Sequence, residues 1–122
     1  MYVLIAEDNA DLRTVFSKAF EASGFEVETA QDGTAAFSVL CERIPEIVVV
    51  DVEMPGMSGL DLVQYIRIHD TNVSPCTIIV VTGNHTYADT PQARLADMFF
   101  VKPVRPTDLV VLARRLSHRI SI

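Results

Sequence analysis

Short strand-like runs alternate along the chain with stretches in which apolar residues recur every three or four positions. Apolar or β-branched runs of four to six residues, bounded by turn-forming residues, are typical of strands in a parallel sheet covered by helices. Five segments are therefore expected to form strands: 3–6, 26–30, 47–50, 77–81 and 98–101.

Helical spacing fills most of the intervals between these runs. The apolar stripes lie at 12–20, 36–40, 60–66 and 109–120. Gly24 suits a C-terminal cap, Ser58 an N-cap, and Pro106 the first turn of the last helix. The interval 83–96 contains Pro91 and few apolar residues, so its helix is expected to be the shortest.

Alternation of five strands with five helices predicts an α/β fold. Parallel strands need right-handed crossovers, which place helices on both faces of a doubly wound sheet and give a three-layer sandwich. With 122 residues, 49% of them hydrophobic, the chain is expected to form one domain spanning 1–122.

Composition excludes several classes of function. No apolar run approaches the roughly 18 residues of a membrane span, and the first residues, MYVLIAEDN, lack a basic leader, so a cytoplasmic protein without membrane contact is expected. Cys41 and Cys76 are then expected to be reduced. A net charge of −6 argues against direct binding to nucleic acid, and only the late segment ARRLSHR is basic.

The residues that follow the expected strands are polar and reactive. They are Glu7 and Asp8 after the first strand, Asp51 after the third, Thr82 and Gly83 after the fourth, and Lys102 after the fifth. Because ligands bind at the carboxyl edge of such sheets, we expect these side chains to meet there.

Three nearby carboxylates repel one another, so they must take up protons or hold a cation. An all-oxygen set suits Mg²⁺, with Asp8 and Asp51 as direct ligands, Glu7 acting through water, and the Glu53 carbonyl completing the set. Asp51 could then act as a nucleophile toward phosphorus. Lys102 and backbone N–H groups near Glu53 and Gly83 would bind the phosphoryl oxygens.

Four motifs in order, EDN, DVEMPGMSGLDL, TG and FFVKP, together resemble the receiver domain of bacterial two-component response regulators. The resemblance covers the whole chain. It implies a flavodoxin-like sheet of order 2-1-3-4-5, a cis Lys102–Pro103 bond, and Mg²⁺-dependent transfer of a phosphoryl group to Asp51. The donor would be a sensor histidine kinase or a histidine phosphotransfer protein.

The resemblance also assigns roles to individual residues. Glu7 and Asp8 would help to bind Mg²⁺, Thr82 and Lys102 would contact the phosphate, and Thr82 with Phe99 would form the switch. The domain would phosphorylate and dephosphorylate itself, regulate a downstream protein or fused output domain, and be a monomer or a phosphorylation-dependent dimer. Strand alternation places Phe99 and Phe100 on opposite faces, so one of them is expected to be buried.

The chain departs from the family pattern in three places. Gly83 replaces a common alanine, and the interval from Thr82 to Lys102 is slightly short, so its helix is expected to be short, shifted or partly disordered. Met98 and Leu112 stand where receivers that pair through their fourth helix, fifth strand and fifth helix carry an Asp and an Arg. That mode of pairing is therefore not expected here.

Three alternatives remain open from the residues. An aspartyl-nucleophile phosphatase or phosphotransferase would usually carry a second Asp where Glu53 stands, and a cap for which the chain has little material. A degenerate receiver serving only as a binding module would have lost key residues, yet all five positions are filled. The third is a phosphorelay shuttle without conformational output.

Overall fold

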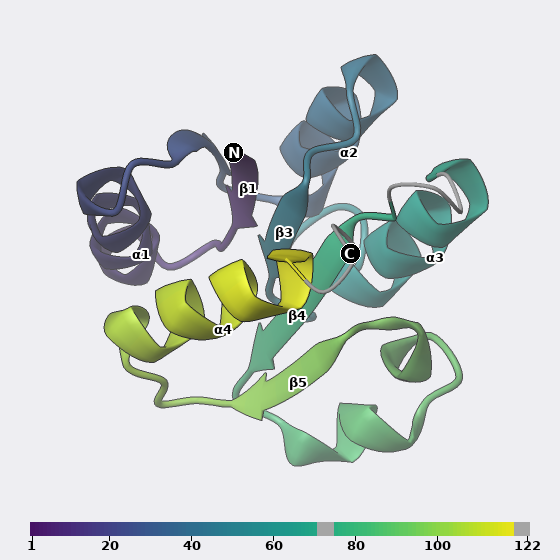
Figure 1. Ribbon diagram of the computed structural model, residues 1–122. Helices are drawn as coiled ribbons and strands as arrows, with labels where there is room; N and C mark the ends of the chain where they lie inside the picture. Colours follow the sequence, from purple (N-terminus) through teal and green to yellow (C-terminus); the bar gives the residue numbers. More distant parts are fainter. Residues whose placement is uncertain (71–74, 119–122) are drawn as a thin grey trace.

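The computed structural model of the protein describes residues 1–70 and 75–118. Five parallel strands form one sheet in the order β2-β1-β3-β4-β5 (Figure 1), as the resemblance implied. The strands are β1 (Tyr2–Ala6), β2 (Glu26–Ala30), β3 (Ile47–Val50), β4 (Thr77–Thr82) and β5 (Met98–Val101). All five expected strands are therefore confirmed, two of them with one additional residue.

Helices cover both faces of the sheet, so the three-layer arrangement is confirmed (Figure 1). The helices are α1 (Ala10–Ala22), α2 (Gly33–Glu42), α3 (Gly59–His69) and α4 (Pro106–His118). One apolar cluster joins the sheet to α1 and α4, and a second joins it to α2 and α3. Alternate residues of β3 enter the two clusters, Val48 in one and Val49 in the other, because successive side chains of a strand point to opposite faces.

Side chains and one glycine set the helix ends. Asn9 and Ser58 cap α1 and α3, and their side-chain oxygens accept backbone N–H groups of the first turn. Gly24, at φ 91°, follows α1 and supplies the left-handed conformation that often ends a helix. Ile120, the last residue of the expected apolar stripe of α4, lies outside the described residues.

The expectation of five helices is wrong by one. Between β4 and β5 the described chain forms only two short 3₁₀ segments, η1 (His85–Asp89) and η2 (Ala93–Leu95). Pro91 disfavours helical geometry at the residue before it, and Thr90 is extended at φ −84°, ψ 149°. The Thr90 hydroxyl then accepts the N–H of Ala93, so the segment restarts instead of continuing.

Within the described residues, no helix has both the length and the apolar character needed to cross a bilayer.

Candidate functional site

Four polar strand ends meet at the carboxyl edge of the sheet. The Asp51 N–H donates to the Ala6 carbonyl over 3.0 Å, and the Lys102 N–H donates to the Thr82 carbonyl over 2.8 Å. These bonds extend the strand pairing by one step and hold the functional residues in register at the point where the strands end. The structure thus brings together the residues that the strand ends indicated.

Three carboxylates lie at this edge, and we call them the acid cluster: Glu7, Asp8 and Asp51. One carboxylate oxygen from each lies within 4.8 Å of the others. Glu7 is 2% exposed and Asp51 6%, whereas Asp8 is exposed to solvent. Two buried carboxylates therefore stand next to one that faces water.

Lys102 supplies the ammonium group that partly balances the acid cluster. Its Nζ lies 2.9 Å from Glu7 Oε1 and 3.0 Å from Asp51 Oδ2. Burial alone would lower the pKa of Lys102, but hydrogen bonds to Glu7 and Asp51 outweigh it and raise the pKa. Burial is the main reason that the pKa of Glu7 is raised, and its bond to Lys102 opposes this. One ammonium for three carboxylates leaves an excess of negative charge.

Backbone groups hold the carboxylates in place. The Glu53 N–H donates to Asp51 Oδ1 over 3.3 Å, so both oxygens of Asp51 accept a bond within the chain. The Asn9 N–H donates to Glu7 Oε2 over 3.1 Å. Gly59 begins α3 against the Asp51 carbonyl, and a Cβ there would come within 2.0 Å of that oxygen. The glycine in the MSG motif therefore lets α3 start directly behind Asp51.

The residues expected to contact the phosphate or to form the switch differ in how exposed they are. Thr82 is fully buried, and its hydroxyl accepts the Asn84 N–H over 3.3 Å. Glu53 and Gly83 are exposed. The Lys102–Pro103 bond is cis, as the resemblance implied.

Phe99 lies next to Val80 in the β5–β4 pairing, and it packs against the apolar cluster of α2 and α3. Phe100 packs against the opposite cluster, so the two rings do face opposite sides. Both are only partly buried, so the expectation that one of them would be buried is wrong. The reason is that β5 is an edge strand whose preceding crossover supplies no α-helix to cover it.

Sequence reasoning missed Arg13 of α1. Its Nη1 donates to the Glu7 carbonyl over 2.8 Å and to the Asp8 carbonyl over 3.4 Å. The sequence did hold one signal for this contact: Arg13 lies at the start of the helix that follows the EDN motif. From there its side chain can reach back to the loop that carries these acids. Arg13 holds the backbone of the acid cluster.

The donor chemistry of the acid cluster suits a hard cation. All its side-chain donors are carboxylate oxygens, and the exposed position of Asp8 leaves room for water ligands. Such a donor set favours Mg²⁺ or Ca²⁺ over zinc.

Comparison with known proteins agrees with this geometry. Residues 3–114 match the family model of the response regulator receiver domain. The chain is 32% identical over 120 residues to the transcriptional regulatory protein PrrA of Mycobacterium tuberculosis, covering 96% of this chain and 50% of PrrA. It is 32% identical to the aerobic respiration control protein ArcA of Escherichia coli K12, covering 97% and 49%. The chain spans about half the length of these curated relatives.

Two solved structures share the fold. The response regulator TrrA of Thermotoga maritima, in complex with Mg²⁺ and BeF, superposes with a TM-score of 0.83 at 26% identity, covering 94% of this chain and 97% of TrrA. The chemotaxis response regulator CheY4 of Vibrio cholerae has a TM-score of 0.80 at 26% identity, with the same coverage.

Proposed function

Because the chain belongs to the response regulator receiver domain family, we propose that it is phosphorylated on Asp51 by a sensor histidine kinase or a histidine phosphotransfer protein. The observation that carries this proposal is the Asp51 carboxylate at the exit of β3, held by Lys102 beside two further acids. A carboxylate oxygen is a known nucleophile for phosphoryl groups.

The transfer replaces one bond to phosphorus by another. An oxygen of Asp51 attacks the phosphorus of a phosphohistidine, the new P–O bond forms as the P–N bond breaks, and the imidazole nitrogen keeps the electron pair. Lys102 must turn its ammonium from Asp51 Oδ2 to the incoming phosphoryl oxygens. The contact between the Glu53 N–H and Asp51 Oδ1 holds the carboxylate plane during the attack.

Mg²⁺ is the cation that this function calls for. Asp8 and Asp51 would hold it directly, Glu7 through water, and the Glu53 carbonyl would complete the protein ligands. When bound, it would neutralise the negative charge on the transferring group. The structure of TrrA in complex with Mg²⁺ and BeF supports Mg²⁺ as the cation.

The output of the domain would be a change in the segment 83–97. A phosphate on Asp51 adds nearly two negative charges and strong acceptors, and the Thr82 hydroxyl would turn toward it. Phe99 would then move into the space that this opens. Support comes from the segment itself, which forms only η1 and η2 and is held by few apolar side chains, so its equilibrium is easily shifted.

Incubation with Mg²⁺ and a small acyl phosphate tests the phosphoacceptor directly. Intact mass should show one added phosphoryl group in the wild type and none in Asp51→Asn. Asp61→Asn is the matched control, because this exposed acid in the first turn of α3 is not a member of the acid cluster, and the variant should gain the group normally. A phosphoryl group on Asp51→Asn at the wild-type rate would exclude the assignment.

Amide exchange tests the switch separately. Beryllofluoride with Mg²⁺ should slow exchange between 83 and 101, and Phe99→Ala should still be phosphorylated but lose this protection. If beryllofluoride leaves exchange unchanged in the wild type, the domain is a phosphorelay shuttle without conformational output.

A further inference from the structure

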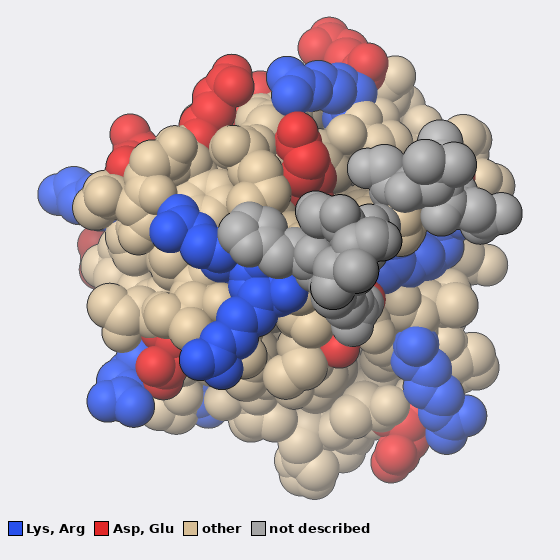
Figure 2. Space-filling view, in the orientation of Figure 1, with Lys and Arg blue, Asp and Glu red and all other residues tan. Residues whose placement is uncertain are grey.

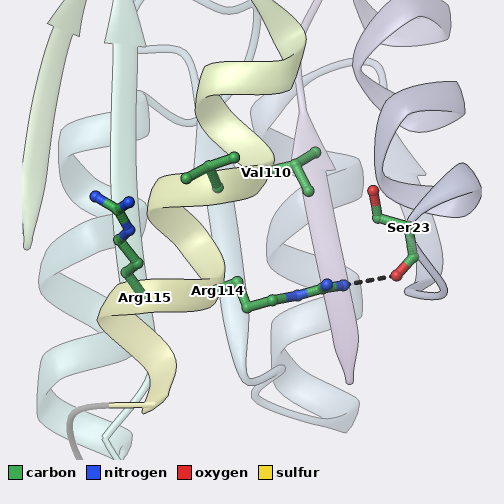
Figure 3. A pocket seen from close by; sticks show the side chains of 5 residues that line it. Ser23, Val110, Arg114 and Arg115 are labelled. Atoms are coloured by element: carbon green, nitrogen blue, oxygen red, sulfur yellow. Dashed lines mark hydrogen bonds between the residues drawn. The ribbon is translucent and has the colours of Figure 1, made fainter.

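A groove runs between α1 and α4, on the face of the sheet away from η1 and η2. It consists of two hollows of about 410 and 280 Å³ that share Ser23, Val110 and Val111. Its apolar lining comes from Ala19 and Ala22 of α1 and from Val110 and Val111 of α4, and polar side chains complete it: Ser23, Thr107, Arg114 and Arg115. Figure 3 shows the end of this groove, where Arg114 reaches toward Ser23 and Arg115 points away from Ser23.

The outward face of α4 carries a charge pattern centred on an apolar residue. Val111 is 49% exposed, Asp108 lies one turn before it, and Arg115 lies one turn after it. Figure 2 shows basic side chains gathered over α4, although the net charge of the whole chain is −6. The helix therefore presents acid, apolar and basic positions in order along one stripe.

Arg114 and Arg115 differ in what they bind. Arg114 Nη2 donates to the Ser23 carbonyl over 2.6 Å, and its guanidinium lies 5.0 Å from the centre of the Phe25 ring, so it belongs to the wall of the groove. Arg115 has no ion-pair partner among residues 1–70 and 75–118. Asp108 is 50% exposed, and its bond to Arg105 is a surface contact between neighbouring turns.

This pattern is complementary to itself when the helix is turned around. In two antiparallel α4 helices that cross at Val111, residues before the crossing on one chain lie against residues after it on the other. Asp108 then lies against the partner's Arg115, and Arg115 against the partner's Asp108. An interface between identical chains related by a two-fold axis requires this reciprocity.

We propose that the protein forms a homodimer through α1 and α4, in which Val111 of each chain packs against Val111 and the adjoining groove of the other. The apolar contact supplies the affinity, and the two charge pairs select the antiparallel arrangement, because exposed ion pairs contribute to specificity more than to affinity. Val15, 46% exposed and one turn before Ala19 on α1, extends the apolar surface.

The location of this interface makes pairing independent of phosphorylation. η1, η2 and Phe99 lie over the α2 and α3 face of the sheet, whereas α1 and α4 cover the other face. The dimer therefore leaves the segment 83–97 accessible. It shares the last helix with the pairing that Met98 and Leu112 argue against, but it combines that helix with α1 instead of β5.

Sedimentation equilibrium with charge-reversed variants tests the proposal. Wild-type protein should show twice the chain mass of 13.5 kDa at micromolar concentration, with or without Mg²⁺ and beryllofluoride. Asp108→Lys and Arg115→Glu should each be monomeric, since each places like charges opposite one another twice. An equimolar mixture of the two variants should regain the dimer mass, because every pair is then between opposite charges.

Arg94→Glu is the matched control, an exposed arginine on η2 at the other face of the sheet, and it should remain dimeric. The mixing experiment also separates pairing from folding, because a misfolded variant cannot recover its partner. Monomeric wild type, or variants that stay monomeric when mixed, would overturn the proposal. Neither result would bear on phosphorylation of Asp51.

Discussion

The two edges of the sheet each carry a cluster of charges, built in opposite ways. At the amino edge, Arg67 of α3 lies between Asp70 and Asp97, with N–O distances of 2.8 and 2.9 Å. Its guanidinium also donates to the carbonyls of Leu95 and Cys76, over 2.8 and 2.6 Å. At the carboxyl edge, Lys102 faces the acid cluster with a single ammonium group.

The difference lies in the ratio of charges and in the kind of cation: one guanidinium faces two carboxylates at the amino edge, and one ammonium faces three at the carboxyl edge. Backbone N–H groups bind carboxylates at both edges, and at the amino edge Cys76 donates to Asp70 and Ile78 to Asp97. A planar guanidinium with fixed donors can tie several elements together, whereas an ammonium is a movable point charge. The amino edge is therefore a structural joint, and the carboxyl edge keeps the negative charge that a cation can neutralise.

The largest effect on stability is expected from Arg67→Ala. Removal of the guanidinium takes away the ion pairs that Arg67 makes with two largely buried carboxylates, which costs about 3 kcal/mol of unfolding free energy. Urea unfolding measures it. Arg105→Ala, which breaks an exposed pair, should change stability far less. An Arg67→Ala midpoint no lower than that of Arg105→Ala would contradict the idea of a structural joint.

A smaller loss than that of Arg67→Ala is expected from Lys102→Met without metal, because burial already raises the pKa of Glu7 and this carboxyl can take up a proton when the ammonium is removed. Mg²⁺ should then stabilise this variant more than the wild type, since the ammonium no longer competes for Glu7 and Asp51. Thermal unfolding over a Mg²⁺ titration measures the difference. Equal stabilisation of the two proteins would show that Lys102 and the cation do not compete.

At high pH, deprotonation of two groups should lower the stability of the protein, one at each edge of the sheet: Lys102 at the carboxyl edge and Tyr2 at the amino edge. The pKa of Lys102 is raised above its ordinary 10.5, so its contribution to stability is complete below that pH and is lost as the pH rises through the folded-state value. Tyr2 has the same sign, because burial and its bond to Glu28 raise its pKa to about 12.

Unfolding of Lys102→Met, Tyr2→Phe and wild type between pH 9 and 12 separates these contributions. Each variant should lose stability less steeply than the wild type. If Lys102→Met matches the wild-type slope, its ion pairs do not account for the alkaline loss.

The smallest effect is expected just outside the acid cluster. Glu53 is exposed and two residues past Asp51, so its carboxylate would flank a water attacking an Asp51 phosphate. Glu53→Ala should change the dephosphorylation rate severalfold, and Mg²⁺ affinity should stay within a factor of a few because the proposed ligand is the backbone carbonyl. Decay of the phosphoprotein and a Mg²⁺ titration measure the two. Complete loss of Mg²⁺ binding would contradict that ligand assignment.

Local signals were strong enough to predict much of the fold. Ile47–Val50 could be recognised as a strand because burial on both faces requires an uninterrupted apolar run. The residue after such a strand has to lie at the sheet edge, which located Asp51. The crossover from 83 to 97 was predicted less well, because competition between Thr90 capping and a continued helix depends on what the segment packs against.

The sequence by itself therefore determined the strands, most helices, and the edge at which Asp51 and Lys102 meet, since these depend on periodicity and on the direction of a parallel strand. Only the tertiary structure decided which groups share each charge. Arg13 reaches the backbone of Glu7, and Arg67 reaches Asp97 thirty residues away, without any local pattern that announces it. Such contacts depend on where packing places a helix over the ends of strands. That placement results from interactions among several segments, so no single segment of the sequence predicts it.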